Sequence, residues 1–198
     1  MQPGSFNTQR TKLHIKNMVG NSCKKLITRT LESTGFIKIH YIALGKSEIS
    51  YNPQVINLST IKTILQNDGF DLLQDEDDIL VEEIKVAVIE YFYYGNNVNA
   101  LMKNSDYLSE RLQKSYGHLS KVFKDKTDTT IEKYIILIKI ERVKELISYD
   151  TLTLSEIAYM MGYSSVQYLS NQFKQVTNES VSQYKKSLSS RTPLDQIL

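Results

Sequence analysis

The chain has 198 residues, of which 41% are apolar and 23% charged, and its formal net charge is +2. This is the composition of an ordinary globular protein, and so small a net charge does not by itself indicate a nucleic-acid partner. The single cysteine, Cys23, excludes an intrachain disulfide, and apolar runs such as Tyr134–Ile138 are too short to span a bilayer. We therefore expect a cytoplasmic protein with no membrane partner.

The charge is distributed unevenly along the chain. Residues 1–74 contain 9 Lys or Arg against 4 Asp or Glu, residues 75–105 contain 2 against 7, and residues 106–198 contain 13 against 11. An acidic block between two basic parts is typical of a connector. The predicted organisation is a flexible tail (1–12), a first domain (13–74), an acidic helical linker (75–104), a second domain (105–188) and a tail (189–198).

Residues 13–74 switch between the periodicity of strands and that of helices. The predicted elements are a strand over Leu13–Lys16, a helix over Ser22–Thr34, strands over Ile37–Leu44 and Glu48–Tyr51, a helix capped by Ser59 and closed by Gly69, and a strand over Phe70–Leu73. This βαββαβ order predicts a ferredoxin-like α+β domain.

The rest of the chain has the periodicity of helices. An acidic stretch at 75–78 suits the N-terminus of a helix, and we expect that helix over about Ile79–Tyr94. Residues 105–188 are predicted to form an all-α domain.

Two stretches of this all-α domain are each typical of a helix, a tight turn and a second helix. They run over Leu108–Lys124 and Leu154–Lys174, and each ends in the pattern Leu-Ser-x-x-Phe-Lys. In a helix-turn-helix the first helix supports the second, and the second presents its outer face to the major groove of DNA. A double helix-turn-helix that binds double-stranded DNA is therefore the leading hypothesis.

In the second unit, Thr153 and Glu156 form a capping box, and Gly162 lies at the turn. Ser164 and Gln167 are predicted to cap the second helix. Tyr168, Leu169 and Phe173 are predicted to face inward, and Tyr159 and Tyr163 to lie in the core. The side chains left outward, or nearly so, are those of Gln167, Ser170, Asn171 and Lys174; Gln and Asn can pair with adenine.

The first unit follows the same logic. Leu108, Leu112, Leu119 and Phe123 are predicted to pack, and Ser115 to cap the second helix. The residues expected on or near the groove side are Gly117, His118, Ser120, Lys121 and Lys124. Between the units, Thr130–Tyr149 is predicted to be a buried helix that holds them one turn of B-DNA apart (~34 Å).

Residues 105–188 resemble the DNA-binding domain of the AraC/XylS family of bacterial transcription regulators. The resemblance is carried by Ile140–Ile147, Leu154–Ala158, Gly162–Ser164 and Tyr168–Lys174. It implies base-reading positions at Gly117, Ser120 and Lys121 in the first unit and at Val166, Gln167 and Asn171 in the second. Gln113 and Asn178 stand where the family usually has glycine, and Asn171 replaces a common arginine. The resemblance thus predicts weak, salt-sensitive binding by one monomer.

Residues 13–74 resemble the heavy-metal-associated domain, which binds soft metals through a Met-x-Cys-x-x-Cys loop. This chain has Met18 and Cys23, but Gly20 replaces the first cysteine. A copper or zinc ion would need a further ligand, from Met18, a histidine or a second chain. The alternatives are a structural cysteine, a reactive cysteine that senses redox state, and a sheet edge that forms a homodimer or binds a partner.

Three functions stay open at this stage. The first is a transcription regulator whose N-terminal domain senses a small effector or metal ion, or mediates assembly. The second is a metal-handling protein with a helical partner-binding module, and the third is an interaction adaptor that does not bind DNA. The sequence has no Gly-rich phosphate loop, metalloprotease His pair or nucleophile elbow, so we expect no enzyme activity.

Overall fold

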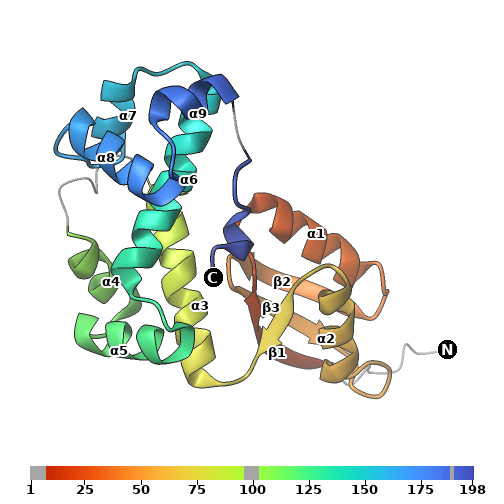
Figure 1. Ribbon diagram of the computed structural model, residues 1–198. Helices are drawn as coiled ribbons and strands as arrows, with labels where there is room; N and C mark the ends of the chain where they lie inside the picture. Colours follow the sequence, from red (N-terminus) through yellow and green to blue (C-terminus); the bar gives the residue numbers. More distant parts are fainter. Residues whose placement is uncertain (1–7, 96–102, 188–189) are drawn as a thin grey trace. The chain divides into compact units, whose positions relative to one another are not determined.

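The computed structural model describes residues 8–95, 103–187 and 190–198 (Figure 1). The chain divides into two compact units, Met1–Val86 and Ala87–Leu198, whose boundary falls within helix α3. Within the described ranges, no helix is both long enough and apolar enough to cross a membrane.

The first unit is a four-stranded antiparallel sheet with two helices, as the βαββαβ order predicted. Its strands lie in the order β2-β3-β1-β4. Its elements are β1 (Gln9–Lys16), α1 (Asn21–Glu32), β2 (Ile37–Ala43), β3 (Lys46–Tyr51), α2 (Leu58–Asn67) and β4 (Asp71–Leu73). All three strand pairs are antiparallel, which confirms the ferredoxin-like fold class.

The core of this unit lies between the sheet and its two helices. In β1, Leu13 and Ile15 are buried while Lys12 and Lys16 are exposed, because successive side chains of a strand point to opposite faces. Helix α1 contributes Ile27 and Leu31, which are four residues apart and therefore on one face. Helix α2 contributes Ile61 and Leu65 by the same spacing.

Several boundaries of this unit differ from the predictions; strand β3, for example, begins at Lys46 rather than Glu48. Strand β1 begins at Gln9 rather than Leu13, because its backbone pairs with β3 from Gln9 opposite Tyr51 onward, so residues 9–12 are not a tail. Helix α2 is capped by Asn57 rather than Ser59, and the Asn57 side chain accepts a hydrogen bond from the backbone N–H of Thr60 at 2.9 Å. Helix α1 ends at Glu32, two residues before the predicted end.

The helix predicted to follow the sheet consists of two elements in the structure. Helix α3 runs over Glu76–Ile89 and opens with Glu76, Asp77 and Asp78, which suit the positive end of the helix dipole. A π-helical turn then covers Glu90–Tyr94. The predicted helix over Ile79–Tyr94 therefore begins three residues early and changes its hydrogen-bonding pattern near the end. The rest of the predicted linker, residues 96–102, lies outside the described residues.

The second unit is helical throughout. Its helices are α4 (Asn104–Leu112), α5 (Tyr116–Thr127), α6 (Ile131–Tyr149), α7 (Leu154–Met160), α8 (Val166–Thr177) and α9 (Val181–Ser187), followed by a short 3₁₀ turn, η3 (Leu194–Gln196). The predicted tail is held to α6 at two points. The backbone N–H of Thr192 donates to Glu141 at 3.0 Å, and Arg191 lies 3.5 Å from Glu145.

Four of these helices end on a residue in the left-handed conformation. These residues are Gln113, Asp128, Asp150 and Asn178, with φ of 54°, 54°, 51° and 62°. Such a residue turns the chain and satisfies the last carbonyl groups of a helix, and Asp and Asn tolerate the conformation better than other non-glycine residues. Asn178, which stands where the resemblance expects glycine, thus adopts a conformation that glycine allows, and Gly162 lies at the turn as predicted, with φ of 66°. Gln113 has the highest steric cost of the four, because it is neither Asp nor Asn.

We expect Gln113→Gly to raise the free energy of unfolding of the full chain by about 0.5–1 kcal/mol, because glycine adopts positive φ without steric cost. Gln113→Ala, which keeps the cost and loses the side chain, should lower it slightly. Urea unfolding followed by circular dichroism measures both. A glycine variant less stable than the alanine variant would show that Gln113 is not strained.

Candidate nucleic-acid interface

The second unit contains two helix-turn-helix pairs, α4 with α5 and α7 with α8. In each pair the second helix is capped by a serine. Ser115 accepts a hydrogen bond from the backbone N–H of His118, and Ser165 accepts one from Tyr168. The supporting helix α7 opens with the predicted capping box, in which Thr153 and Glu156 bond to each other's backbone N–H. Local sequence therefore sets where each helix of the second pair begins.

The two pairs are an internal repeat that extends beyond the Leu-Ser-x-x-Phe-Lys pattern. At the C-terminus of α5, the Thr127 hydroxyl donates to the carbonyl of Phe123 at 2.7 Å. At the C-terminus of α8, Thr177 donates to Phe173 at 2.8 Å. Each threonine hydroxyl also accepts a hydrogen bond from the backbone N–H two residues later. The same device ends both helices.

The repeat includes the aromatic contacts behind each second helix. The rings of Phe123 and Tyr134 lie 5.7 Å apart, and those of Phe173 and Tyr184 lie 5.5 Å apart. All four side chains are almost completely buried. Aromatic pairs at this separation contribute about 0.5–1.5 kcal/mol beyond the area they bury. Helices α5 and α8 are thus fixed to the helix that follows each of them by equivalent contacts.

Helix α6 is shared by both pairs. Near its start, Tyr134 packs on Phe123 of α5. Further along, Ile140, Val143 and Ile147 join a cluster with Leu169 and Phe173 of α8. Ten of its residues are buried, as the apolar run predicted. Figure 1 shows α6 running past both pairs.

Polar side chains on the second half of α6 are paired rather than free. Lys144 donates to Glu141 at 2.7 Å, and both side chains are buried. Glu145 accepts hydrogen bonds from Arg142 at 2.7 Å and from Tyr149 at 2.9 Å. Burial alone would raise the pKa of Glu145, but these hydrogen bonds lower it below its ordinary value. The charged side chains of the segment Ile140–Ile147 therefore mainly stabilise α6.

Four of the five residues predicted to read DNA in the first pair are exposed on α5: Gly117, His118, Lys121 and Lys124. Ser120 is half-buried. A side chain added at Gly117 would meet no atom within 4 Å, so this position faces open space. The ammonium group of Lys124 donates to the carbonyl of Asp128 at 2.7 Å, which caps the end of α5.

The second pair shows a different distribution of polar groups. On α8, Gln167, Asn171 and Lys174 are exposed, and Ser170 is half-buried. The amide of Gln167 donates to the side-chain oxygen of Asn171 at 2.9 Å, so the two amides form one polar patch. Val166 is half-buried and packs against the core cluster of this pair.

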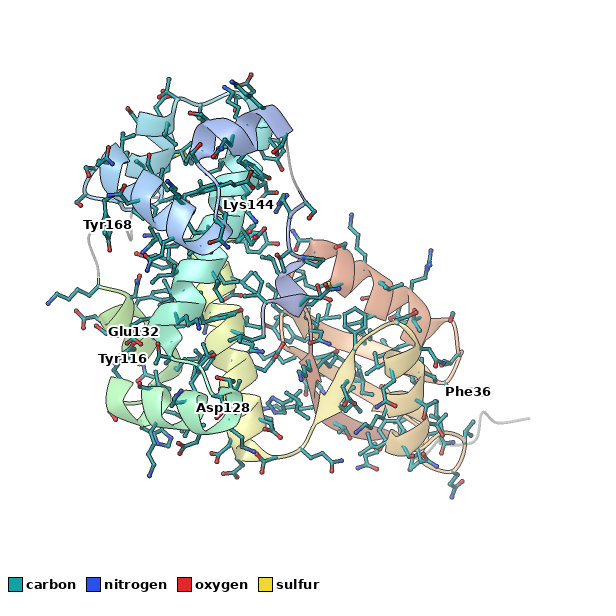
Figure 2. All side chains as sticks on the ribbon, in the orientation of Figure 1. Phe36, Tyr116, Asp128, Glu132, Lys144 and Tyr168 are labelled. Carbon is teal, nitrogen blue, oxygen red and sulfur yellow. The ribbon has the colours of Figure 1, made fainter. Side chains whose placement is uncertain are left out.

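Three predictions for the second pair are wrong. The cap of α8 is Ser165, not Ser164, since the Ser165 hydroxyl is the one that accepts from Tyr168. Tyr168 is 54% exposed, because Leu169 and Phe173 occupy the core-facing positions and Tyr168 lies about 100° away from Leu169 around the helix. Figure 2 shows Tyr168 at the outer side of α8. Tyr159 is 78% exposed, while Tyr163 is in the core as predicted.

A groove of about 430 Å³ lies between the two pairs, and the sequence did not reveal it. It is lined by residues of α4, α5, α6, α8 and the turn before α8, among them Tyr116, Glu132, Ile136, Lys139, Tyr163 and Gln172. Tyr116 donates a hydrogen bond to Glu132 at 2.5 Å, and Figure 2 labels these two residues next to each other. Tyr163 donates a hydrogen bond to Gln172 at 2.7 Å. The hydrogen bond from Tyr116 lowers the pKa of Glu132.

Lys139 is the cation of this groove. Its ammonium lies 3.9 Å from the ring centroid of Tyr163 and 5.7 Å from that of Phe92. Burial lowers the pKa of Lys139 to about 8. The signal in the sequence was a single lysine within the apolar run Tyr134–Ile140.

The residues predicted to bind metal lie in or against the core of the first unit. Met18 is fully buried in the core of the first unit, and Cys23 is half-buried against the same core. His14 lies on β1 and His40 on β2, where His40 is hydrogen-bonded to Ser50 at 2.9 Å. Among the residues the structure describes, no group of three or more His, Cys, Asp or Glu side chains is placed to hold a metal ion. Metal binding by Met18 and Cys23 stays a prediction.

Comparisons with known proteins agree with this geometry. Residues 108–187 match the model of a helix-turn-helix domain family. The xylose operon regulatory protein of Escherichia coli is 30% identical over 99 residues, which are 50% of this chain and 25% of that protein. Copper-transporting ATPase 2 of Mus musculus is 33% identical over 82 residues, which are 40% of this chain and 6% of that protein. The chain thus spans a quarter or less of the length of these two relatives.

A solved structure is also similar. The transcriptional regulator CdpR from Pseudomonas aeruginosa superposes with a TM-score of 0.46 at 12% identity, over 74% of this chain and 47% of that one.

The second unit is a DNA-binding type of domain, a double helix-turn-helix on a shared buried helix. Residues 108–187 belong to the AraC-type helix-turn-helix domains. The similarity to a copper-transporting ATPase lends support to a heavy-metal-associated-like fold in the N-terminal part.

We expect Lys139→Met to raise the free energy of unfolding at pH 7, because the wild-type ammonium is held at a pKa of about 8 while the unfolded chain keeps its ordinary value near 10.4. Between these two pKa values the unfolded state binds more protons at Lys139 than the folded state does. The free energy of unfolding of the wild type therefore rises with pH in this window. The difference between variant and wild type should therefore shrink from pH 8 to pH 10.5. Urea unfolding at several pH values measures it. A constant difference across this window would contradict the assignment.

Proposed function

We propose that the protein is a sequence-specific, DNA-binding transcription regulator of the AraC/XylS type, in which α5 and α8 enter successive major grooves of one duplex. The observation that carries this proposal is the duplication described above. Two helices with exposed polar faces pack against one buried helix, α5 through Phe123 on Tyr134 and α8 through Leu169 and Phe173. A pair of reading helices held this way can contact DNA twice without dimerisation.

The two reading helices offer different chemistry to the bases. On α5, Lys121 can donate to guanine or to phosphate, Ser120 is permissive, and His118 is exposed beside the bare Gly117. On α8, the amide patch of Gln167 and Asn171 suits adenine, which presents one acceptor and one donor in the major groove. The proposed site therefore reads a mixed sequence, with the adenine contact made by α8.

The remaining residues of the site position the protein. Lys124 and Lys174 lie at corresponding places near the ends of α5 and α8, where they can contact phosphates. Ser170 and Val166 border the reading face of α8, and Val166 offers only apolar contact, such as that with a thymine methyl group. Because few charged side chains lie on α8, we infer weak and salt-dependent binding by a single copy.

The N-terminal unit would then sense an effector or mediate assembly, with a homodimer as one arrangement. Two features support such a role: a folded domain with its own core precedes the DNA-binding unit, and relatives of that unit carry the names of operon regulators. A bacterial cytoplasm is the compartment in which such a regulator would meet its DNA. We propose no catalytic activity for the chain.

Binding to selected genomic fragments tests the proposed reading face. The double variant Lys121→Ala with Asn171→Ala should lose about 2–4 kcal/mol of discrimination between specific and random DNA, because each contact to a base contributes about 1–3 kcal/mol. Gel shifts at fixed salt measure the ratio of the two affinities.

The matched control is Ser182→Ala with Lys186→Ala, which removes one polar and one charged side chain from the exposed surface of α9. The control should keep the wild-type ratio. If the double variant on α5 and α8 also keeps it, the assigned reading face is wrong; if wild-type protein binds no fragment at all, the proposed function is wrong.

Gly117 allows a gain-of-contact experiment. Gly117→Gln places on α5 the residue that α8 carries at the corresponding position, Gln167, and the structure has open space for it. We expect a new preference for adenine at one position of the selected site, worth about 1–3 kcal/mol. Sequencing of DNA selected by the variant and by wild type compares the two. Identical selected sites would mean that Gly117 does not face the bases.

A further inference from the structure

The face of the N-terminal sheet that α1 and α2 do not cover is strongly basic. We propose that this open face is a second DNA-binding surface, which contacts the phosphate backbone without reading sequence. The choice of DNA as the partner rests on the proposed function. The surface itself lies outside the helix-turn-helix domain.

The register of the strands places the side chains of the open face in three rows. Lys38 of β2, Ser50 of β3 and Arg10 of β1 form the first row. Tyr41, Glu48 and Lys12 form the second, and Ala43, Lys46 and His14 form the third. The neighbouring positions Ile37, Ile49 and Leu13 point the other way, into the core. This alternation follows from the period of two residues in a strand.

The positive charges of these rows are mostly unpaired. The carboxylate of Glu48 lies 2.7 Å from Arg10, so this acid and this cation neutralise each other. Lys12, Lys38 and Lys46 are exposed, and in the described part of the chain no carboxylate lies within ion-pair distance of them. Three unpaired lysines, one on each of β1, β2 and β3, leave a surplus of positive charge across the width of the face.

The shape of the face also suits an extended anion. A hollow of about 260 Å³ is lined by Lys12, His14, Tyr41, Lys46 and Glu48 and by the buried residues Leu13 and Ser47. Tyr41, one of the lining residues, is 51% exposed. Lys38 lies outside the hollow, in the first row. A small anion in the hollow would leave Lys38 uncontacted, whereas a phosphate backbone can follow the rows from Lys46 to Lys38.

Two acidic groups next to the helices of the same unit are paired with side chains of those helices. There, Lys62 pairs with Asp71 at 3.3 Å, and Thr30 donates to Asp68 at 2.6 Å. The open face thus supplies phosphate contacts that α8, with its uncharged reading patch, lacks.

The salt dependence of binding tests this inference in the full-length protein. For duplex DNA, the slope of log K against log [salt] changes by about 0.9 for each phosphate contact. The triple variant Lys12→Gln, Lys38→Gln and Lys46→Gln should therefore flatten the slope by about 2–3 and weaken binding roughly tenfold or more at 0.1 M salt. Its preference for the specific site over random DNA should stay at the wild-type ratio, because these lysines contact no base.

The matched control is Lys24→Gln, Lys25→Gln and Lys62→Gln, which removes the same charge from α1 and α2. The control should keep a slope within about 1 of wild type. Equal slopes for the two triple variants would overturn the inference while leaving the proposed function in place. Absence of any DNA binding by wild type would instead overturn the proposed function.

Vesicles of phosphatidylserine distinguish a membrane from DNA as the source of the phosphates. If the lysines of the sheet are needed for cosedimentation with these vesicles but not for the salt slope on DNA, the surface binds lipid and the inference is wrong. We expect wild-type protein to stay in the supernatant when the vesicles are pelleted. We also expect the triple variant to have a flattened salt slope on DNA.

Discussion

The helical unit depends on one constraint, which is that a single helix, α6, must be buried by both helix-turn-helix pairs. Tyr134 near its start packs on Phe123, while Ile140 and Val143 pack with Phe173 and Leu169. A helix that is apolar on most of its sides is stable only when those sides are buried, and burying α6 takes both pairs together. The orientation of α5 relative to α8 is thereby fixed by the packing of the core, and the exposed faces remain free for a partner.

The repeat preserves the packing of the two pairs but not their outer chemistry. Equivalent threonines, aromatic pairs and serine caps support α5 and α8. Outside that frame, Lys121 corresponds to Asn171 and Gly117 to Gln167. Because the supporting contacts do not include these exposed positions, α5 and α8 can present different side chains to a partner without a change in fold.

The two units divide the interaction with DNA between them in this view. Under the proposed function, contacts to bases come from a few uncharged or singly charged side chains on α5 and α8, which discriminate but bind weakly. The proposed contacts to phosphate come from Lys124 and Lys174 and from the open face of the sheet. Affinity that arises from phosphates is independent of sequence, so a basic sheet raises occupancy on all DNA and leaves discrimination to the helices.

Sequence alone determined the features that depend on local periodicity and backbone preference: the βαββαβ order, the double helix-turn-helix, the capping box at Thr153 and the turn at Gly162. Tertiary structure decided the rest. Tyr159 and Tyr168 are exposed because other residues fill the core, and the predicted tail is held to α6 by contacts that no local pattern indicates. The rows of the open sheet face depend on strand register, including a bulge between Ile39 and Tyr41, and register is set by pairing between distant segments.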